Sequence, residues 1–304
     1  MPVTPCLDCP LRALPLFLAH SAEELALVQQ IKRSELVLQA GDTLIHEGES
    51  DTRLYTLLVG WGYRFKTLSD GRRQILNFLL AGDFIGVQQK MSDAAIHGVV
   101  MLTDSRLCVF DRNALWELHR RQPSMGFNIT WLTAHEESLV DDNLLSIGRR
   151  SAEERVATLL ILLYKRAAAV HNVADAGTAG ALAAPRASGN TRKTGSTGIV
   201  LTTETTGSSG SSGSSGNSVN SGTTSTTDAI NAAGLPGVPF PLTQQHLADA
   251  LGLSLAHTNK TLRKLQKRGL YRIDDGRLRL LDPKALARLA DLYGDGRPPP
   301  RPLI

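Results

Sequence analysis

The chain has 304 residues, of which 42% are hydrophobic, and it carries a formal net charge of +4 at pH 7. No apolar run is long enough to span a bilayer, and the first ten residues lack the charged and apolar regions of a signal peptide. We therefore expect a cytoplasmic protein of two domains whose three cysteines are not paired in disulfides. From residue 240 onward, 12 Lys and Arg face 6 Asp and Glu, a balance that favours contact with nucleic acid.

Residues 14–122 are predicted to form an antiparallel β-roll that serves as a sensor domain. Glycines separate short apolar runs in LYTLLVGWGYRFKTL and RRQILNFLLAGDFIG, at the spacing typical of β-hairpins. Cys108 lies in one such apolar run, so we expect its side chain in the core.

Residues 123–148 are predicted to form one long helix, because Phe127, Trp131, Leu139 and Leu145 recur at helical spacing. A helix of about 24 residues is ~36 Å long. We expect its apolar stripe to pack against the same helix of a second subunit and form a homodimer. Packing against the β-roll of the same chain is the alternative.

A further helix is expected to start at Ser151, which can form a capping box with Glu154, and its apolar run VATLLILLY should be buried. Gly, Ser and Thr make up 30 of the 40 residues from 188 to 227. Such a composition buries too little apolar surface to offset its ordering entropy. We therefore expect a disordered loop over 171–235, interrupting a DNA-binding domain over 149–293. The loop is interpreted as a tolerated insertion, with an interaction segment as the alternative.

The segment from Leu242 to Leu281 predicts a helix, a tight turn at Gly252, a basic helix and a β-hairpin. With Ser254 as its N-cap, the basic helix has an apolar face that should pack on the preceding helix. The opposite face holds four cations and one amide but no carboxylate: Ala256, Asn259, Lys260, Arg263, Lys264 and Lys267. Like charges on one face repel and need an anionic partner. The pattern therefore favours contact with phosphates and bases over a solvated basic helix.

An Asp-Gly turn at 275–276 joins two alternating runs and predicts the hairpin, with Arg277 and Arg279 on one face of this wing. A last helix is expected to close near Gly294. Residues 294–304 are expected to form an unstructured tail.

The order of these parts resembles the Crp/Fnr family of bacterial transcription regulators. The motifs that carry the resemblance are RRQILNFLLAGDFIG at 72–86, DSRLCVFDR at 104–112 and LTQQHLADALGLSLAHTNKTLRKLQKRGL at 242–270. It implies an α+β fold with a β-roll like that of cyclic-nucleotide-binding domains, a dimerisation helix and a C-terminal winged helix-turn-helix. It also implies a homodimer on a near-palindromic operator in double-stranded DNA, with RNA polymerase as a further partner.

The family's places for base contacts hold Ala256, Asn259 and Lys260 in this chain. The glutamate that would accept a hydrogen bond from cytosine is absent, so we expect an operator that differs from the best-known ones. Asn259 can bind adenine and Lys260 can bind guanine. His257 stands where the family often contacts phosphate. The remaining candidates for DNA contact are Thr243, Ser254, Arg263 and Lys264.

The expected sensor pocket departs from the family's pattern. In members that bind cyclic AMP, a Glu after a Gly holds the ribose, and an Arg–Ser pair holds the phosphate. The glycine here is Gly86, and the corresponding places look like Val87, Ile96 and His97. Without an arginine, a buried phosphate would lack its main compensating charge. We therefore expect no cyclic AMP, and either another ligand or none.

The motif CLDC at 6–9 resembles the start of the N-terminal cysteine cluster in oxygen-sensing members. A cubane cluster normally takes four thiolates, and this chain has three cysteines, so we expect no iron–sulfur cluster. Cys6 and Cys9 remain candidates for a thiol redox sensor, or are bystander thiols.

The sequence offers little support for catalysis, since it contains no Gly-rich phosphate loop, no HExxH and no paired carboxylates at a plausible spacing. We expect a DNA-binding transcription regulator and no enzyme. The alternative is a ligand-binding signalling module whose helix-turn-helix serves protein contacts. The salt dependence of DNA binding separates the two, because only a regulator should lose affinity steeply as salt rises.

Overall fold

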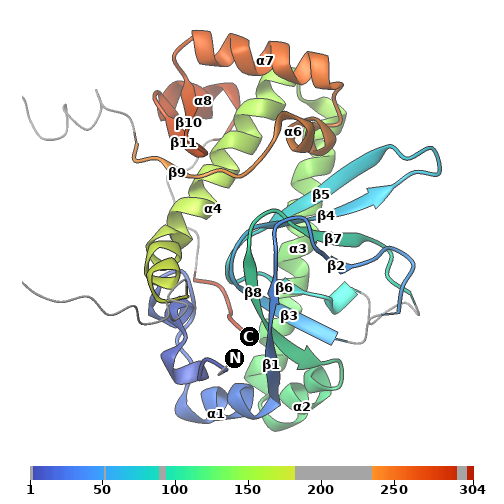
Figure 1. Ribbon diagram of the computed structural model, residues 1–304, viewed down its shortest axis with the longest axis vertical. Coiled ribbons are helices and arrows are strands. Elements are labelled where there is room, and N and C mark those ends of the chain that lie inside the picture. Colours follow the sequence, from blue (N-terminus) through green and yellow to red (C-terminus); the bar gives the residue numbers. More distant parts are fainter. Residues whose placement is uncertain (1–2, 51–52, 89–93, 182–234, 293–299) are drawn as a thin grey trace, which may run out of the picture.

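The computed structural model describes residues 3–50, 53–88, 94–181, 235–292 and 300–304, with the backbone alone for 171–181. Figure 1 shows the β-roll beside the long helix α3, with α6, α7 and α8 gathered at one end of the molecule. Helices α1 and α2 lie at the other end, close to both ends of the chain. This is the α+β architecture that the sequence predicted.

The β-roll consists of two four-stranded antiparallel sheets. One has the order β1-β8-β3-β6, and the other has the order β2-β7-β4-β5. The strands are β1 (Lys32–Leu38), β2 (Thr43–Ile45), β3 (Arg53–Val59), β4 (Gly62–Thr67), β5 (Arg73–Leu79), β6 (Phe84–Ile85), β7 (Gly98–Met101) and β8 (Ser105–Asp111).

Alternation along the strands places one apolar face of each sheet inside the roll. Tyr55, Leu57, Val99 and Leu107 are completely buried there. A second cluster joins the outer side of the roll to the helices and includes Cys108, which is buried as expected. The two clusters fix the roll as a rigid support for the elements around it.

The short helices before and after the strands of the roll are two 3₁₀ turns, η1 (Cys6–Asp8) and η2 (Pro10–Ala13), and the helices α1 (Ala22–Ile31) and α2 (Ala114–Arg121). Ser21 caps α1 by accepting the backbone N–H of Glu24, whose carboxylate accepts the N–H of Ser21 in return. The predicted long helix is confirmed as α3 (Pro123–Arg149).

Helix α4 (Ala152–Ala181) begins with the predicted capping box. The backbone N–H of Ser151 donates to Glu154 Oε2 at 2.8 Å, and the N–H of Glu154 donates to Ser151 Oγ at 3.4 Å. The apolar run is largely buried, with Val156, Leu160 and Tyr164 in the core.

The expected start of the loop at residue 171 is wrong, because α4 continues to Ala181. The continuation is rich in alanine, the residue with the highest helix propensity, so the helix persists without caps or a strong apolar pattern. The remainder of the expected loop, over 182–234, lies outside the described residues.

The C-terminal domain contains α6 (Gln244–Leu251), α7 (Leu255–Lys267) and α8 (Pro283–Leu289). Strands β10 (Tyr271–Asp274) and β11 (Arg277–Leu280) form the predicted hairpin. Its turn has φ of +50° at Asp275 and +67° at Gly276, the conformation expected for an Asp-Gly hairpin. Strand β9 (Val238–Pro239), which the sequence did not reveal, pairs with β11.

The expectation of an unstructured tail is wrong for residues 300–304. Arg301 forms a parallel bridge with Phe17, while Leu303 and Ile304 are buried against the β-roll. Arg301 pairs with the buried carboxylate of Asp83, and Leu303 and Ile304 pack in an apolar groove. The local composition of the segment does not predict these contacts with distant residues. Residues 293–299 lie outside the described residues. Among the described residues, no helix combines the length and apolarity needed to cross a bilayer.

Candidate nucleic-acid interface and its link to the sensor domain

Helix α7 is positioned by a tight turn and by its apolar face. Gly252 has φ of +63° and closes α6 in the left-handed conformation that favours glycine. Ser254 then caps α7, its Oγ accepting the backbone N–H of His257 at 3.2 Å. The side chains predicted to face inward, Thr258, Leu262 and Leu265, are buried. Thr261 is buried beside them. The opposite side of α7 therefore faces outward.

That outward side of α7 contains cations and no carboxylate. The exposed side chains are Ala256, His257, Lys260, Arg263, Lys264 and Lys267. Asn259 is half-buried, and its Oδ1 is covered and has no hydrogen-bond partner among the described residues. The exposed cations form a surface that suits the phosphates of a duplex, and Asn259 lies at its edge.

One carboxylate engages the C-terminal end of α7. Glu153, at the start of α4, contacts Lys264 and also accepts from Arg268 Nη1 at 3.0 Å. Lys264 would therefore have to exchange a carboxylate for a phosphate on binding DNA. Lys260 and Arg263 make no ion pair with the part of the chain that the structure describes, so they are more available to a nucleic acid.

The first helix of the motif, α6, begins with an exposed capping box. Thr243 Oγ1 accepts the backbone N–H of His246 at 3.2 Å, and His246 Nδ1 accepts the N–H of Thr243 at 3.2 Å. A histidine thus takes the place of the usual acidic residue in the capping box. Because free N–H groups and the helix dipole favour anions at an N-terminus, Thr243 is placed where a phosphate could approach.

The two arginines of the hairpin predicted as a wing differ in exposure and in hydrogen bonding. Arg277 donates to the carbonyl of Gly237 at 2.9 Å, which ties β11 to the segment before β9. Arg279 is exposed. Arg279 is therefore the more exposed of this predicted pair, and Arg277 is partly buried.

The β-roll contacts α6 directly. Arg73 on β5 donates to Asp249 Oδ2 from Nε at 3.0 Å and from Nη2 at 2.7 Å. Gln74 Nε2 donates to the carbonyl of Ala250 at 3.1 Å. The rings of Tyr63 and His246 lie 5.4 Å apart. The contacts join the sensor domain to the helix that supports α7.

The four residues expected at the sensor pocket differ in exposure and surroundings. Gly86 has φ of +103°, and a side chain there would meet the carbonyl of Arg53, so it shapes a turn. Val87 packs against the core, and Ile96 is half exposed. His97 is buried, and its Nε2 has no partner among the described residues. Burial, together with Arg64 and Lys66, lowers the pKa of His97 to about 4.

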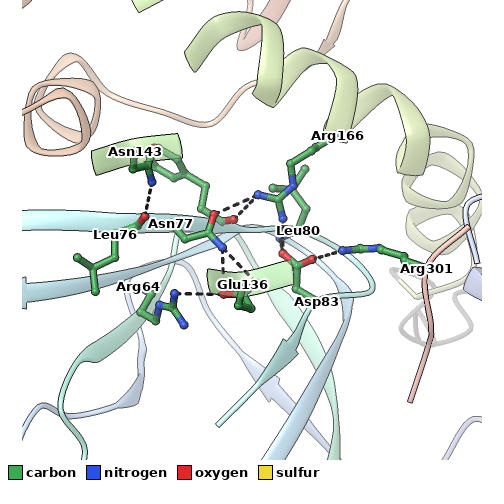
Figure 2. A network of polar contacts seen from close by, with 10 residues as sticks. Arg64, Leu76, Asn77, Leu80, Asp83, Glu136, Asn143, Arg166 and Arg301 are labelled. Carbon is green, nitrogen blue, oxygen red and sulfur yellow. Dashed lines mark hydrogen bonds and ion pairs between the residues drawn. The ribbon is translucent and has the colours of Figure 1, made fainter. Parts of the chain in front are cut away.

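A buried ion pair, which the sequence did not reveal, lies between the β-roll and α3. Arg64 Nη2 on β4 and Glu136 Oε2 on α3 are 3.1 Å apart, and Asn77 Nδ2 lies 3.4 Å from both carboxylate oxygens (Figure 2). Burial raises the pKa of Glu136 despite Arg64. The pair holds polar groups inside the space between the roll and the helix.

Asp83, in the turn before β6, is a second polar centre. Arg166 on α4 and Arg301 near the end of the sequence reach it from different sides (Figure 2). Arg166 Nη2 lies 2.5 Å from Oδ2, and Arg301 Nη1 lies 2.7 Å from Oδ1. Burial alone would raise the pKa of Asp83, but the two guanidinium groups overcome this effect and hold the pKa below its ordinary value.

The three cysteines are free thiols that line one small void of about 20 Å³. Burial raises the pKa of Cys6, and it raises that of Cys108 to about 12. Cys9 is partly exposed. Among the described residues, no group of three His, Cys, Asp or Glu side chains is arranged to hold a metal ion.

A β-roll joined by a long helix to a winged helix-turn-helix defines a transcription regulator with a sensor-type domain. Comparisons agree: residues 35–122 match the model of the cyclic nucleotide-binding domain, and residues 226–289 match that of the Crp-like helix-turn-helix domain. The chain belongs to the Crp/Fnr family of DNA-binding transcription regulators.

Similar proteins support the assignment. The nitrogen fixation regulation protein FixK of Bradyrhizobium diazoefficiens is 26% identical over 94% of this chain and 93% of its own length. The transcriptional activator protein FnrL of Cereibacter sphaeroides is 32% identical over 54% of this chain, a match that spans 65% of FnrL. In fold, the chain is similar to the structure of FixK2 from Bradyrhizobium japonicum, with a TM-score of 0.58 and 19% identity over 87% of this chain and 98% of that one.

Proposed function

We propose that the chain acts as a homodimer on a near-palindromic operator and that α7 enters the major groove of each half-site. The observation that carries this proposal is the exposed, carboxylate-free basic face of α7, held outward by its buried opposite side. Binding a polyanion would relieve the repulsion between its cations. The protein would thus act by binding and not by catalysis.

Within this face we assign base contacts to Asn259 and Lys260, with Ala256 close to the base edges. Lys260 is exposed and suits guanine. Asn259 can bind adenine once its amide turns outward, which would also give its unpaired oxygen a partner. Phosphate contacts are assigned to Thr243, Ser254, His257, Arg263 and Lys264.

The dimer is proposed to form through α3. Four large apolar side chains of this helix are exposed: Phe127 (69%), Val140 (40%), Leu144 (70%) and Leu145 (51%). A row of exposed apolar residues on one long helix is expected to pack against a second helix, and a symmetric dimer supplies one. The alternative, in which this row packs against the β-roll of the same chain, is less favoured, because the roll already contacts another side of α3.

The sensor domain is proposed to respond to something other than cyclic AMP. His97, in the place expected for a phosphate ligand, is neutral at physiological pH because its pKa is about 4. Arg64, the arginine whose charge acts on His97, is already paired with Glu136. The other cation whose charge acts on His97, Lys66, is exposed, so a cyclic phosphate buried there would lack a buried, unpaired arginine. Signals would reach α7 through the contact between Arg73 and Asp249.

By analogy with its activator relatives, the dimer would act on chromosomal DNA in the cytoplasm and contact RNA polymerase. The test is selection of bound sequences from a random duplex pool by the purified full chain. We expect a two-fold symmetric consensus whose half-sites are spaced by one helical turn. A pool without enrichment would favour the alternative, in which the helix-turn-helix serves protein contacts.

A further inference from the structure

Residues 300–304 return to the β-roll after the last helix of the DNA-binding domain. In Figure 1 this segment lies beside the N-terminal part of the chain, far from α7. The backbone N–H of Arg301 donates to the carbonyl of Leu16 at 2.8 Å, and the N–H of Leu18 donates to the carbonyl of Arg301 at 2.9 Å. Such a two-bond bridge gives the segment a defined register on its neighbour.

The side chain of Arg301 contacts three different groups: a carboxylate, a backbone carbonyl and an aromatic ring. Its Nη1 donates to Asp83 at 2.7 Å, and its Nη2 donates to the carbonyl of Ala81 at 3.2 Å. The guanidinium group also lies over the ring of Phe17, 5.1 Å from its centroid. Cation–π contact and a charged hydrogen bond in one place select arginine over lysine.

The last two residues fill an apolar groove beside this site. Leu303 and Ile304 are only 2% and 5% exposed. The hydroxyl of Thr56 donates to the carbonyl of Ile304 at 2.6 Å. Beneath them, Cys6 and Cys108 line the void that Leu303 and Ile304 also border.

We propose that this groove on the β-roll is a peptide-binding site for the sequence Arg-Pro-Leu-Ile and that residues 300–304 occupy it as an intramolecular strap. The strap links the DNA-binding domain to the sensor domain. Its arginine shares Asp83 with Arg166 of α4, so one buried carboxylate holds both the strap and the helix that leads into the DNA-binding domain. Releasing the strap loosens that link and uncovers the thiols beneath.

Attachment to the same chain makes the strap hard to displace. A covalently linked segment has an effective concentration on the order of millimolar at its site. A free peptide at micromolar concentration should therefore fail to enter the groove of the unmodified protein. It should enter the groove once the strap can no longer dock.

The test uses the full-length double variant Leu303→Asp and Ile304→Asp, in which two carboxylates cannot enter the apolar groove. A fluorescent peptide, Pro-Pro-Arg-Pro-Leu-Ile with an amidated end, is titrated into this variant and into the unmodified chain. We expect saturable binding to the variant, at least tenfold tighter than to the unmodified chain. A peptide with Gln in place of Arg should bind the variant at least tenfold more weakly. Equal binding of the peptide to both proteins would overturn the proposal.

Alkylation of Cys108 by iodoacetamide, followed by mass spectrometry, gives an independent readout. The rate should rise at least tenfold in the double variant and fall again when the unlabelled peptide is added. The matched control is Leu68→Asp, which adds a carboxylate at an exposed position outside the strap and should leave the rate unchanged. Rescue by the peptide distinguishes strap release from general unfolding. An alkylation rate that is the same in all three proteins would contradict the proposed strap.

Discussion

Arg73 on β5 of the sensor domain donates two hydrogen bonds to a single carboxylate oxygen of Asp249 on α6. The Asp249 side chain is only 12% exposed, and Arg73 is also held by the hydroxyl of Tyr63 at 2.7 Å. Helix α6 also packs against α7, with Leu247 and Leu251 in the shared core, so we expect a shift of β5 to reach α7 over two contacts. The pair is therefore a direct polar contact between the β-roll and the helix-turn-helix.

The Arg73–Asp249 contact is testable by a double-mutant cycle with Arg73→Ala and Asp249→Ala. Both side chains are largely buried, so we expect a coupling free energy of about 1 kcal/mol in urea unfolding. The matched control pair is Arg33 and Asp111, an exposed ion pair within the β-roll for which the coupling should be near zero. A coupling of zero for Arg73 and Asp249 would mean that the domains are not joined here in solution.

Lys260→Ala should relax the sequence preference at one base pair of each half-site. Loss of a specific base contact costs about 1–3 kcal/mol on the selected operator and little on random DNA. Lys267→Ala is the control, since an exposed cation farther along α7 should affect both duplexes alike. Competition binding on a set of single-base operator variants measures the difference. Equal losses on operator and random DNA would make Lys260 a phosphate contact.

Leu144→Asp should dissociate the proposed dimer, because a charge would be buried in the helix–helix contact. We expect a monomer by sedimentation velocity and at least a tenfold weaker affinity for the two-half-site operator. Leu68→Asp, on an exposed turn of the β-roll, serves as the control. If the Leu144 variant sediments like the unmodified chain, α3 is not the dimer interface.

His97 should make stability depend on pH. Its pKa is about 4 in the fold and ordinarily near 6.5, so the unfolded chain binds the proton first as pH falls. The free energy of unfolding should decrease by up to about 3 kcal/mol between pH 6.5 and pH 4 on this account. His97→Gln should remove that part of the slope in urea unfolding followed across this range. Since other histidines titrate in both proteins, an identical slope would show that His97 is not buried as a neutral ring.

The DNA-binding helix was predictable because its evidence is local. A period of 3.6 residues separates Leu262 and Leu265 from Lys260 and Arg263, and Ser254 and Gly252 mark its start. The family resemblance and the long helix rest on patterns of the same local kind.

What the sequence did not reveal depends on contacts between distant residues. Arg64 and Glu136 are far apart in the sequence and meet only when α3 packs on the roll. Strand β9 has two residues and exists because β11 offers it an edge. The docking of Arg301 on Asp83 depends on a turn 218 residues earlier in the sequence, so the local composition predicted a free tail instead.

The affinity of the purified full chain for its selected operator, measured between 50 and 200 mM KCl, tests the central proposal most directly. With the basic face of α7 on phosphates, the affinity should fall at least tenfold over this range, and more steeply if each subunit neutralises several phosphates. The double variant Lys260→Glu and Lys267→Glu should lose specific binding at both salt concentrations. An affinity that does not change with salt concentration and is retained in the double variant would contradict the account.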